Sequence, residues 1–141
     1  MKNAIITGAS RGIGEAMALR LGQMGYNVVV NYRSNSSREL AEALAARLKE
    51  EHGVEAIAVQ ADVSRYEDCE KLVQAAVDAF GEKIDVLVNN AGMNSRSPFC
   101  ELAREKYTAV LETNLLSAFH MCHFVVPYMV CLLYTSPSPR D

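Results

Sequence analysis

The stretch that decides the fold is Thr7-Gly8-Ala9-Ser10-Arg11-Gly12-Ile13-Gly14. It follows a short apolar run at residues 5–6 and opens a segment with helical periodicity. A side chain at Gly8 or Gly12 would obstruct the turn or hold a pyrophosphate off the backbone, and one at Gly14 would push the helix off the sheet. Bare N–H groups at a helix start also attract phosphate. The stretch therefore predicts a strand, a dinucleotide-binding turn and a helix.

Outward from this turn, the chain alternates between short apolar runs and longer amphipathic segments. The runs at residues 5–6, 28–30, 56–59 and 85–88 are mostly β-branched and uninterrupted, which is typical of parallel strands buried on both faces. Between them, Leu40, Leu44 and Leu48 lie at four-residue steps, as on one helix face. This order predicts an α/β fold, a Rossmann-type doubly wound parallel sheet with right-handed crossovers.

Two four-residue segments have the pattern of a helix capping box. Residues 36–39 have the sequence Ser-Ser-Arg-Glu and residues 64–67 have Ser-Arg-Tyr-Glu. In such a box the serine and the glutamate each bond a backbone group left free at the helix start. We therefore expect one helix to begin after Ser36 and another to begin after Ser64.

Composition limits the classes of function. The chain has 141 residues, of which 50% are hydrophobic and 22% charged, and its formal net charge is -3. These values predict one globular domain, and the absence of a basic cluster argues against a nucleic-acid partner. The four cysteines form no C-x-x-C pair, and no cationic leader is present, so we expect a cytoplasmic protein with reduced thiols. Cys122 with His120 and His123 could supply metal ligands, but positions on the surface and core of a helix are the favoured interpretation.

Three motifs in order carry a resemblance to a known family. The glycines are spaced G-x-x-x-G-x-G, Asn89-Asn90-Ala91-Gly92 ends the fourth apolar run, and Asn114 stands in Thr113-Asn114-Leu115. Over residues 1 to about 130 the chain resembles the short-chain dehydrogenase/reductase family. Within that family the resemblance is strongest to reductases of 3-oxoacyl chains carried by acyl carrier protein. It implies an oxidoreductase that transfers hydride between a nicotinamide cofactor and a carbonyl/alcohol substrate.

Charge at the end of the second strand indicates which cofactor binds. NAD sites present an Asp or Glu there to the ribose 2′-hydroxyl. Here the strand ends Asn31-Tyr32-Arg33-Ser34, with no acid before Glu39. Arg33 would pair with a 2′-phosphate, and Arg11 could join it, because a guanidinium binds phosphate in a forked pair. The prediction is NADP(H), with NAD(H) as the alternative cofactor.

The resemblance assigns further roles residue by residue. Asp62 matches the family residue that accepts a bond from the adenine amino group, with Val63 packed beside the ring. Asn89, Ala91 and Gly92 would line the nicotinamide side, Asn89 also tying the fourth strand to its neighbours. Asn114 matches the catalytic asparagine, which holds a water in the proton relay. The cofactor-binding residues expected from the glycine turn are Gly8, Ser10, Arg11, Gly12, Ile13 and Gly14.

The family's catalytic serine and its Y-x-x-x-K pair are not found in this sequence. None of the six tyrosines has a lysine four residues later. Residues 131–141 match, residue for residue, one reading frame of a transposase adapter used in DNA library preparation. We therefore expect an incomplete dinucleotide-binding domain at residues 1–130, ending after the fourth strand and the following long helix, and a non-native tail at residues 131–141. As written, the chain is expected to be inactive.

Two other functions stay open beside the oxidoreductase. One is a nucleotide-binding module without turnover, which fits the missing Y-x-x-x-K. The other is a tail-anchored membrane protein, because residues 113–139 carry no charged side chain. Asn114, His120, His123 and Pro127 argue against a membrane span. The resemblance implies instead that this helix packs against the same helix of a partner subunit, so the complete protein is expected to be a homo-oligomer acting on a small-molecule or acyl-thioester substrate.

Overall fold

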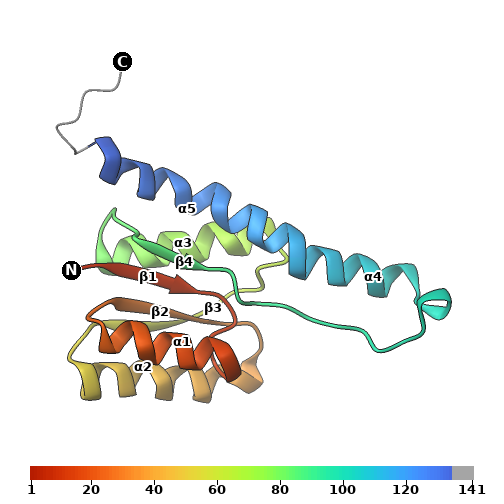
Figure 1. Ribbon diagram of the computed structural model, residues 1–141, viewed down its shortest axis with the longest axis horizontal. Coiled ribbons are helices and arrows are strands. Elements are labelled where there is room, and N and C mark those ends of the chain that lie inside the picture. The colour runs from red at the N-terminus through yellow and green to blue at the C-terminus, as the bar shows by residue number, and fades with distance from the viewer. Residues whose placement is uncertain (135–141) are drawn as a thin grey trace.

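A computed structural model describes the backbone of residues 1–134 and the side chains of residues 1–130. The chain alternates between strands and helices along its length (Figure 1). The elements, in chain order, are β1 (Asn3–Ile6), α1 (Gly12–Gln23), β2 (Asn27–Tyr32), η1 (Asn35–Ser37), α2 (Arg38–His52), β3 (Ala56–Gln60), α3 (Tyr66–Phe80), β4 (Val86–Val88), η2 (Phe99–Glu101), α4 (Arg104–Leu111), η3 (Glu112–Leu116) and α5 (Ser117–Tyr134).

The described strands form one parallel sheet in the order β3-β2-β1-β4. Ile5 of β1 lies opposite Val29 of β2 on one side and Leu87 of β4 on the other. The four apolar runs of the sequence all become strands, so the predicted doubly wound α/β fold is confirmed. Because the order reverses at β1, the chain crosses from one half of the sheet to the other between β3 and β4.

Helices cover both faces of the sheet (Figure 1). Ile6, Val28 and Val30 are buried against α1 and α2 in one core cluster. Ile5 and Val29 point the opposite way and are buried with side chains of α3 and α5 in a second cluster. The alternation follows from the two-residue repeat of a strand, and both faces are apolar because both are covered.

Neither predicted capping box forms. α2 begins after Ser37 and α3 after Arg65, and neither helix start has a side-chain cap hydrogen bond. Ser36 pairs instead with Ser34, Oγ to Oγ at 2.8 Å. The hydroxyl of Ser64 donates to Asp62 Oδ1 at 2.6 Å. The serines are engaged in the loops before the helices, so the pattern was correct about the position of each helix and wrong about the bonds.

α4, η3 and α5 form one long helical segment that is mostly apolar. η3 is a π-helical turn within it, a feature often found at functional sites. The stretch Arg104–Val130 is long and apolar enough to cross a membrane by length and composition, and only 17% of its most apolar window is buried. α5 continues to Tyr134. The remainder of the predicted non-native tail, residues 135–141, lies outside the described residues.

His120 and His123 lie on α5 and face α3. The ring of Tyr66 makes an edge contact with His120, with centroids 5.5 Å apart, and lies 6.2 Å from the ring of His123. Across the described residues, no group of three or more potential metal ligands comes together. The two histidines therefore belong to an aromatic contact between helices.

Candidate nucleotide-binding site

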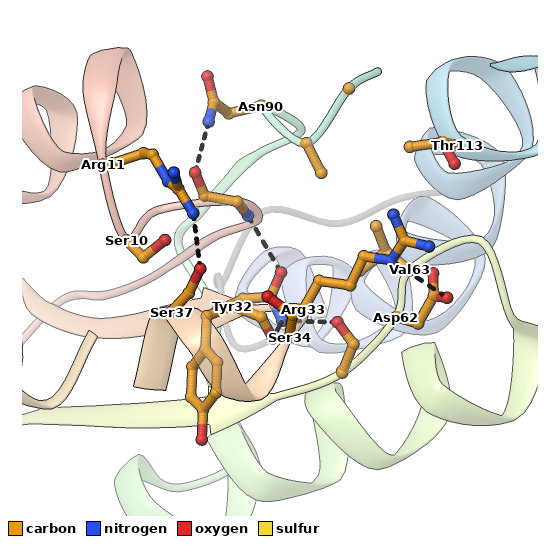
Figure 2. A pocket seen from close by; sticks show the side chains of 15 residues that line it. Ser10, Arg11, Tyr32, Arg33, Ser34, Ser37, Asp62, Val63, Asn90 and Thr113 are labelled. Carbon is orange, nitrogen blue, oxygen red and sulfur yellow. Dashed lines mark hydrogen bonds and ion pairs between the residues drawn. The ribbon is translucent and has the colours of Figure 1, made fainter. Parts of the chain in front are cut away.

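A cleft of about 370 Å³ opens at the carboxyl ends of the strands. It lies where the strand order reverses, which is the usual ligand position in open parallel sheets. The loops after β1, β2, β3 and β4 all contribute to it (Figure 2). The lining residues are Gly8, Ser10, Arg11, Asn31, Tyr32, Arg33, Ser34, Ser37, Ala61, Asp62, Val63, Asn90, Ala91, Gly92 and Thr113.

The glycine turn between β1 and α1 is packed on one side and open on the other. A Cβ on Gly8 would lie 3.0 Å from Ala91 Cα, and one on Gly14 would lie 2.6 Å from the carbonyl oxygen of Gly8. At Gly12, by contrast, a Cβ would meet nothing within 4 Å, although its φ of +63° favours glycine. The turn is thus pressed against the end of β4 and exposes its backbone at Gly12, where an anion can approach.

Asn31 fixes the glycine turn to the neighbouring strands. Its side chain is 2% exposed, and its Oδ1 accepts a hydrogen bond from the Gly8 N–H at 3.0 Å. Its Nδ2 donates to the carbonyl oxygens of Val59 and Ala61, both at 3.2 Å. The backbone carbonyl of Asn31 accepts from Ala9 N at 2.8 Å. One buried amide therefore joins the ends of β1, β2 and β3, and all its bonding groups are satisfied.

Asn90 and Thr7 fix the same turn from the side of β4. Asn90 Nδ2 donates to the carbonyl oxygens of Thr7 at 3.2 Å and Gly8 at 2.9 Å. The hydroxyl of Thr7 accepts from the backbone N–H groups of Asn90 and Ala91, each at 3.0 Å. Asn90, not Asn89 as the sequence predicted, ties β4 to its neighbours. Asn89 Nδ2 instead lies 3.7 Å from Cys122 Sγ on α5.

Two arginines flank the cleft (Figure 2). Arg11 Nη2 donates to Ser37 Oγ at 2.9 Å, which joins the glycine turn to the loop after β2. Arg33 Nε lies 3.5 Å from Asp62 Oδ2, and the Arg33 side chain is 66% exposed. Because both guanidinium groups border the cleft, this part of it carries positive charge suited to an anion such as a phosphate.

Asp62 is held in a turn before α3. Its Oδ1 accepts from the N–H of Ser64 at 3.0 Å and from the Ser64 hydroxyl. Partial burial raises the pKa of Asp62, but the hydrogen bonds from Ser64 and the charges of Arg33 and Arg65 together bring it below its ordinary value. The carboxylate is therefore ionised at neutral pH and can accept a hydrogen bond from a ligand.

Asn114 lies in η3 and pairs with the loop after β4. Its Oδ1 accepts from the N–H of Met93 at 2.7 Å, and its Nδ2 donates to the carbonyl oxygen of Met93 at 2.8 Å. A Cβ on Gly92 would approach Asn114 Oδ1 to 3.3 Å. In this structure the side chain of Asn114 therefore holds the loop that follows Gly92 against the long helix.

The cleft contains only part of the predicted site. The predicted residues that line it are Gly8, Ser10, Arg11, Arg33, Asp62, Val63, Ala91 and Gly92. Gly12, Ile13 and Gly14 belong to the adjoining turn and helix start, and Asn89 and Asn114 lie beside the cleft without lining it. The lining residues that the sequence did not predict are Asn31, Tyr32, Ser34, Ser37, Ala61, Asn90 and Thr113. One signal was available, because Asn31 is a polar residue that directly follows the apolar run at residues 28–30.

Comparison with known proteins gives consistent matches. The family model described as short chain dehydrogenase matches residues 2–135. The 3-oxoacyl-(acyl-carrier-protein) reductase of Staphylococcus epidermidis is 40% identical over 129 residues, which cover 92% of this chain and 51% of that protein. The chain spans about half the length of the curated relatives it matches.

Two solved structures are similar in sequence and in fold. A blue fluorescent protein from a metagenomic library, in complex with NADPH, has a TM-score of 0.86 and 34% identity, covering 91% of this chain and 51% of that one. L-sorbose reductase from Gluconobacter frateurii, complexed with NADPH and L-sorbose, has the same TM-score and identity, covering 93% of this chain and 48% of that one. Both of these solved structures contain NADPH.

Proposed function

Because the chain belongs to the short-chain dehydrogenase family, we propose that it is the NADP(H)-binding part of an oxidoreductase. The family is one of oxidoreductases, and its solved members include proteins complexed with NADPH. The observation that carries the proposal for this chain is the cleft at the carboxyl ends of the strands, which is lined by Gly8 of the glycine turn and by Arg11 and Arg33. Bound NADP(H) would give or accept the hydride at its nicotinamide.

The residues of the cleft fit the parts of this cofactor. The Cβ-free approach at Gly12 and the start of α1 suit the pyrophosphate. Arg33 and Arg11 suit the 2′-phosphate, since β2 ends without an acidic residue. Asp62 presents an ionised acceptor to the adenine amino group, with Val63 beside the ring. Each of these groups binds and orients the cofactor and takes no part in bond breaking.

The nicotinamide end is built from the residues after β4. Ala91 and Gly92 line the cleft there, and Asn114 holds the adjoining Met93 through two hydrogen bonds. In the complete enzyme Asn114 would serve the proton relay, as in the family. The substrate we propose is a 3-oxoacyl thioester, on the likeness to the reductase of S. epidermidis, and we propose a cytoplasmic homo-oligomer.

The chain as written supports a second function, nucleotide binding without turnover. No tyrosine in the sequence is followed four residues later by lysine, so the general acid of the family reaction is not supplied by these residues. We propose that the catalytic serine, tyrosine and lysine belong to protein sequence beyond residue 130, and that residues 131–141 are not native. Sequencing the source locus through codons 131–141 tests the latter.

Titration with the two reduced cofactors tests the proposed function. NADPH and NADH are added separately to the chain and to the longer polypeptide encoded at its locus, and binding is followed by the fluorescence of the reduced nicotinamide. We expect NADPH to bind more tightly than NADH to both proteins, because only NADPH carries the 2′-phosphate. Turnover of a 3-oxoacyl thioester is expected of the longer polypeptide only. The assignment fails if neither protein takes up either cofactor.

A further inference from the structure

Three exposed polar side chains form a closed triangle behind the loop that follows β2. Gln60, the last residue of β3, donates from Nε2 to Asn35 Oδ1 at 3.0 Å. Arg38, the first residue of α2, donates from Nη2 to Gln60 Oε1 at 3.0 Å and to Asn35 Oδ1 at 3.4 Å. Each of the three side chains therefore contacts the other two, and none of them lines the cleft.

The triangle is attached to the backbone of the cleft. Gln60 Nε2 also donates to the carbonyl oxygen of Arg33 at 3.2 Å, and Gln60 itself is paired in register with Tyr32 at the end of β2. The short loop thus held carries Arg33, Ser34 and Ser37 into the cleft. One amide at a strand end therefore fixes the backbone from which Arg33 extends.

This attachment matters because the arginine itself is poorly restrained. The Arg33 side chain is 66% exposed, and the ion pair that it forms with Asp62 is 3.5 Å long. A long exposed side chain loses rotamer entropy when it binds a ligand, and a backbone that is already fixed adds no ordering cost of its own. On the opposite side of the loop, Ser37 accepts the bond from Arg11. The position of the loop therefore affects both arginines that border the cleft.

A third arginine, Arg38, does not line the cleft. Arg38 follows Arg33 closely in the sequence, but its Nη2 donates to Gln60 and Asn35. An arginine that donates to neighbouring side-chain amides stabilises the loop. An arginine that binds a phosphate must instead direct its donors into the cleft. The structure thus separates two cleft arginines from one supporting arginine.

Building on the proposed NADP(H) site, we propose that Gln60, Asn35 and Arg38 are positioning residues that set the preference for a 2′-phosphorylated cofactor. They act through the loop after β2 and do not touch the cofactor. Their removal leaves the charges of Arg33 and Arg11 in place but frees the backbone that directs them. The cofactor then loses affinity through its 2′-phosphate only. The rest of the nucleotide keeps its contacts, because it is bound by the glycine turn and Asp62.

Two small ligands isolate this effect. Adenosine 2′,5′-bisphosphate and adenosine 5′-monophosphate differ only in the 2′-phosphate, so the ratio of their dissociation constants reports on that group alone. We expect Gln60→Ala to lower the preference for the bisphosphate by about three- to tenfold, the range for one or two lost hydrogen bonds. Affinity for the monophosphate should not change. Both are measured by isothermal titration calorimetry on the full chain.

Gln74→Ala is the matched control. Gln74 is an exposed glutamine on α3, and its side chain donates to Asp78 one helical turn away from it, outside the cleft. This variant loses the same side chain and one hydrogen bond, so its ligand ratio should equal that of the unmodified chain. Thermal unfolding of both variants checks that the fold is retained, as expected for exposed positions.

A double variant shows whether Arg38 acts through Gln60 or binds the 2′-phosphate directly. If Arg38 acts through Gln60, Gln60→Ala with Arg38→Ala should reduce the preference no further than the larger single effect. Equal losses for both ligands in Gln60→Ala, no loss at all, or additive effects in the double variant would each overturn the inference. If the unmodified chain binds neither ligand, the proposed nucleotide site itself fails, a result different from these three.

Discussion

At the scale of single residues, we propose that Arg33, directly after β2, makes the main contact with the 2′-phosphate. We expect Arg33→Asp to weaken NADPH binding by about ten- to a hundredfold, because charge-assisted hydrogen bonds are lost and a carboxylate then faces the 2′-phosphate. NADH, which presents a 2′-hydroxyl, should then be bound more tightly than NADPH. The measurement is the dissociation constant of each cofactor.

The control for this substitution is Arg20→Asp. Arg20 is exposed on α1 and bonds only to Gln23 among the side chains described, so the change in net charge is the same and the cleft is untouched. The two cofactor affinities should keep their original ratio in this variant. If Arg33→Asp leaves that ratio unchanged as well, Arg33 does not bind the 2′-phosphate.

At the scale of secondary-structure elements, Gly14 sets how closely the start of α1 packs against the turn after β1. A Cβ there would lie 2.6 Å from Gly8 O and 2.8 Å from Ala9 Cα, both backbone atoms that cannot move independently. Helix propensity alone favours alanine over glycine, so Gly14→Ala would otherwise stabilise the chain. We expect it to destabilise the chain by about 1–3 kcal/mol instead, the usual cost of overpacking.

Urea unfolding followed by circular dichroism measures this change. Ala16→Ser, on the exposed side of the same helix, should alter the free energy of unfolding by less than about 0.5 kcal/mol. Because α1 supplies the phosphate-binding helix start, Gly14→Ala should also weaken NADPH binding. A stabilised Gly14→Ala variant would mean that α1 can move away from the turn at little cost.

Cys69 reports on how stably α3 packs against the sheet. It lies buried in the core between α3 and the sheet, and its Sγ is 3.2 Å from the carbonyl oxygen of Val63. Burial, with the nearby charges of Asp68 and Asp62, raises the pKa of Cys69 from 9.0 to about 11. The fold therefore favours the neutral thiol, and the stability that this contributes is complete below pH 9 and is lost as the pH rises toward 11.

Alkylation at pH 8 tests this burial. Cys100 and Cys122 are exposed, so iodoacetamide should modify them first, and Cys69 should react only when the second core opens. Peptide mass mapping over time gives the rate at each site. Modification of Cys69 as fast as Cys122 would show that α3 is not stably packed on the sheet. A small amount of urea should selectively accelerate Cys69.

At the scale of the whole molecule, the long helical segment leaves apolar side chains in water. Leu111, Leu115, Phe119 and Val126 are exposed by 53%, 63%, 71% and 44%. Exposed apolar patches of this kind promote association. Within the described residues, β4 pairs on one side only, with β1, and an unpaired strand edge adds to this tendency. We expect the chain to associate as its concentration rises.

Sedimentation velocity at increasing concentration measures the association. Leu115→Glu with Phe119→Glu should shift the chain toward the monomer, because both changes place charge on the exposed helix face. Met24→Glu, at an isolated exposed apolar position at the end of α1, should have no such effect. A single monomeric species at every concentration would contradict the prediction.

The amino-acid sequence is enough to predict the fold, the glycine turn and a positive charge directly after β2. These features depend on local patterns. Apolar side chains repeat every two residues in a strand and every 3.6 residues in a helix, and the glycines of the turn lie within one short segment. Arg33 was identifiable because it directly follows an apolar strand. The family was identifiable because its motifs are short and ordered.

Contacts between residues far apart in the chain, by contrast, set which side chains hold the cleft together. Asn31 and Asn90 bond the glycine turn at Gly8 from 23 and 82 residues away, and the capping serines were drawn into loop contacts instead. A polar side chain bonds whichever groups the packed strands bring near it. Once it is buried it must form such bonds, because an unpaired buried polar group costs free energy. The partners of an amide therefore follow from the strand order, which the sequence around that amide does not contain.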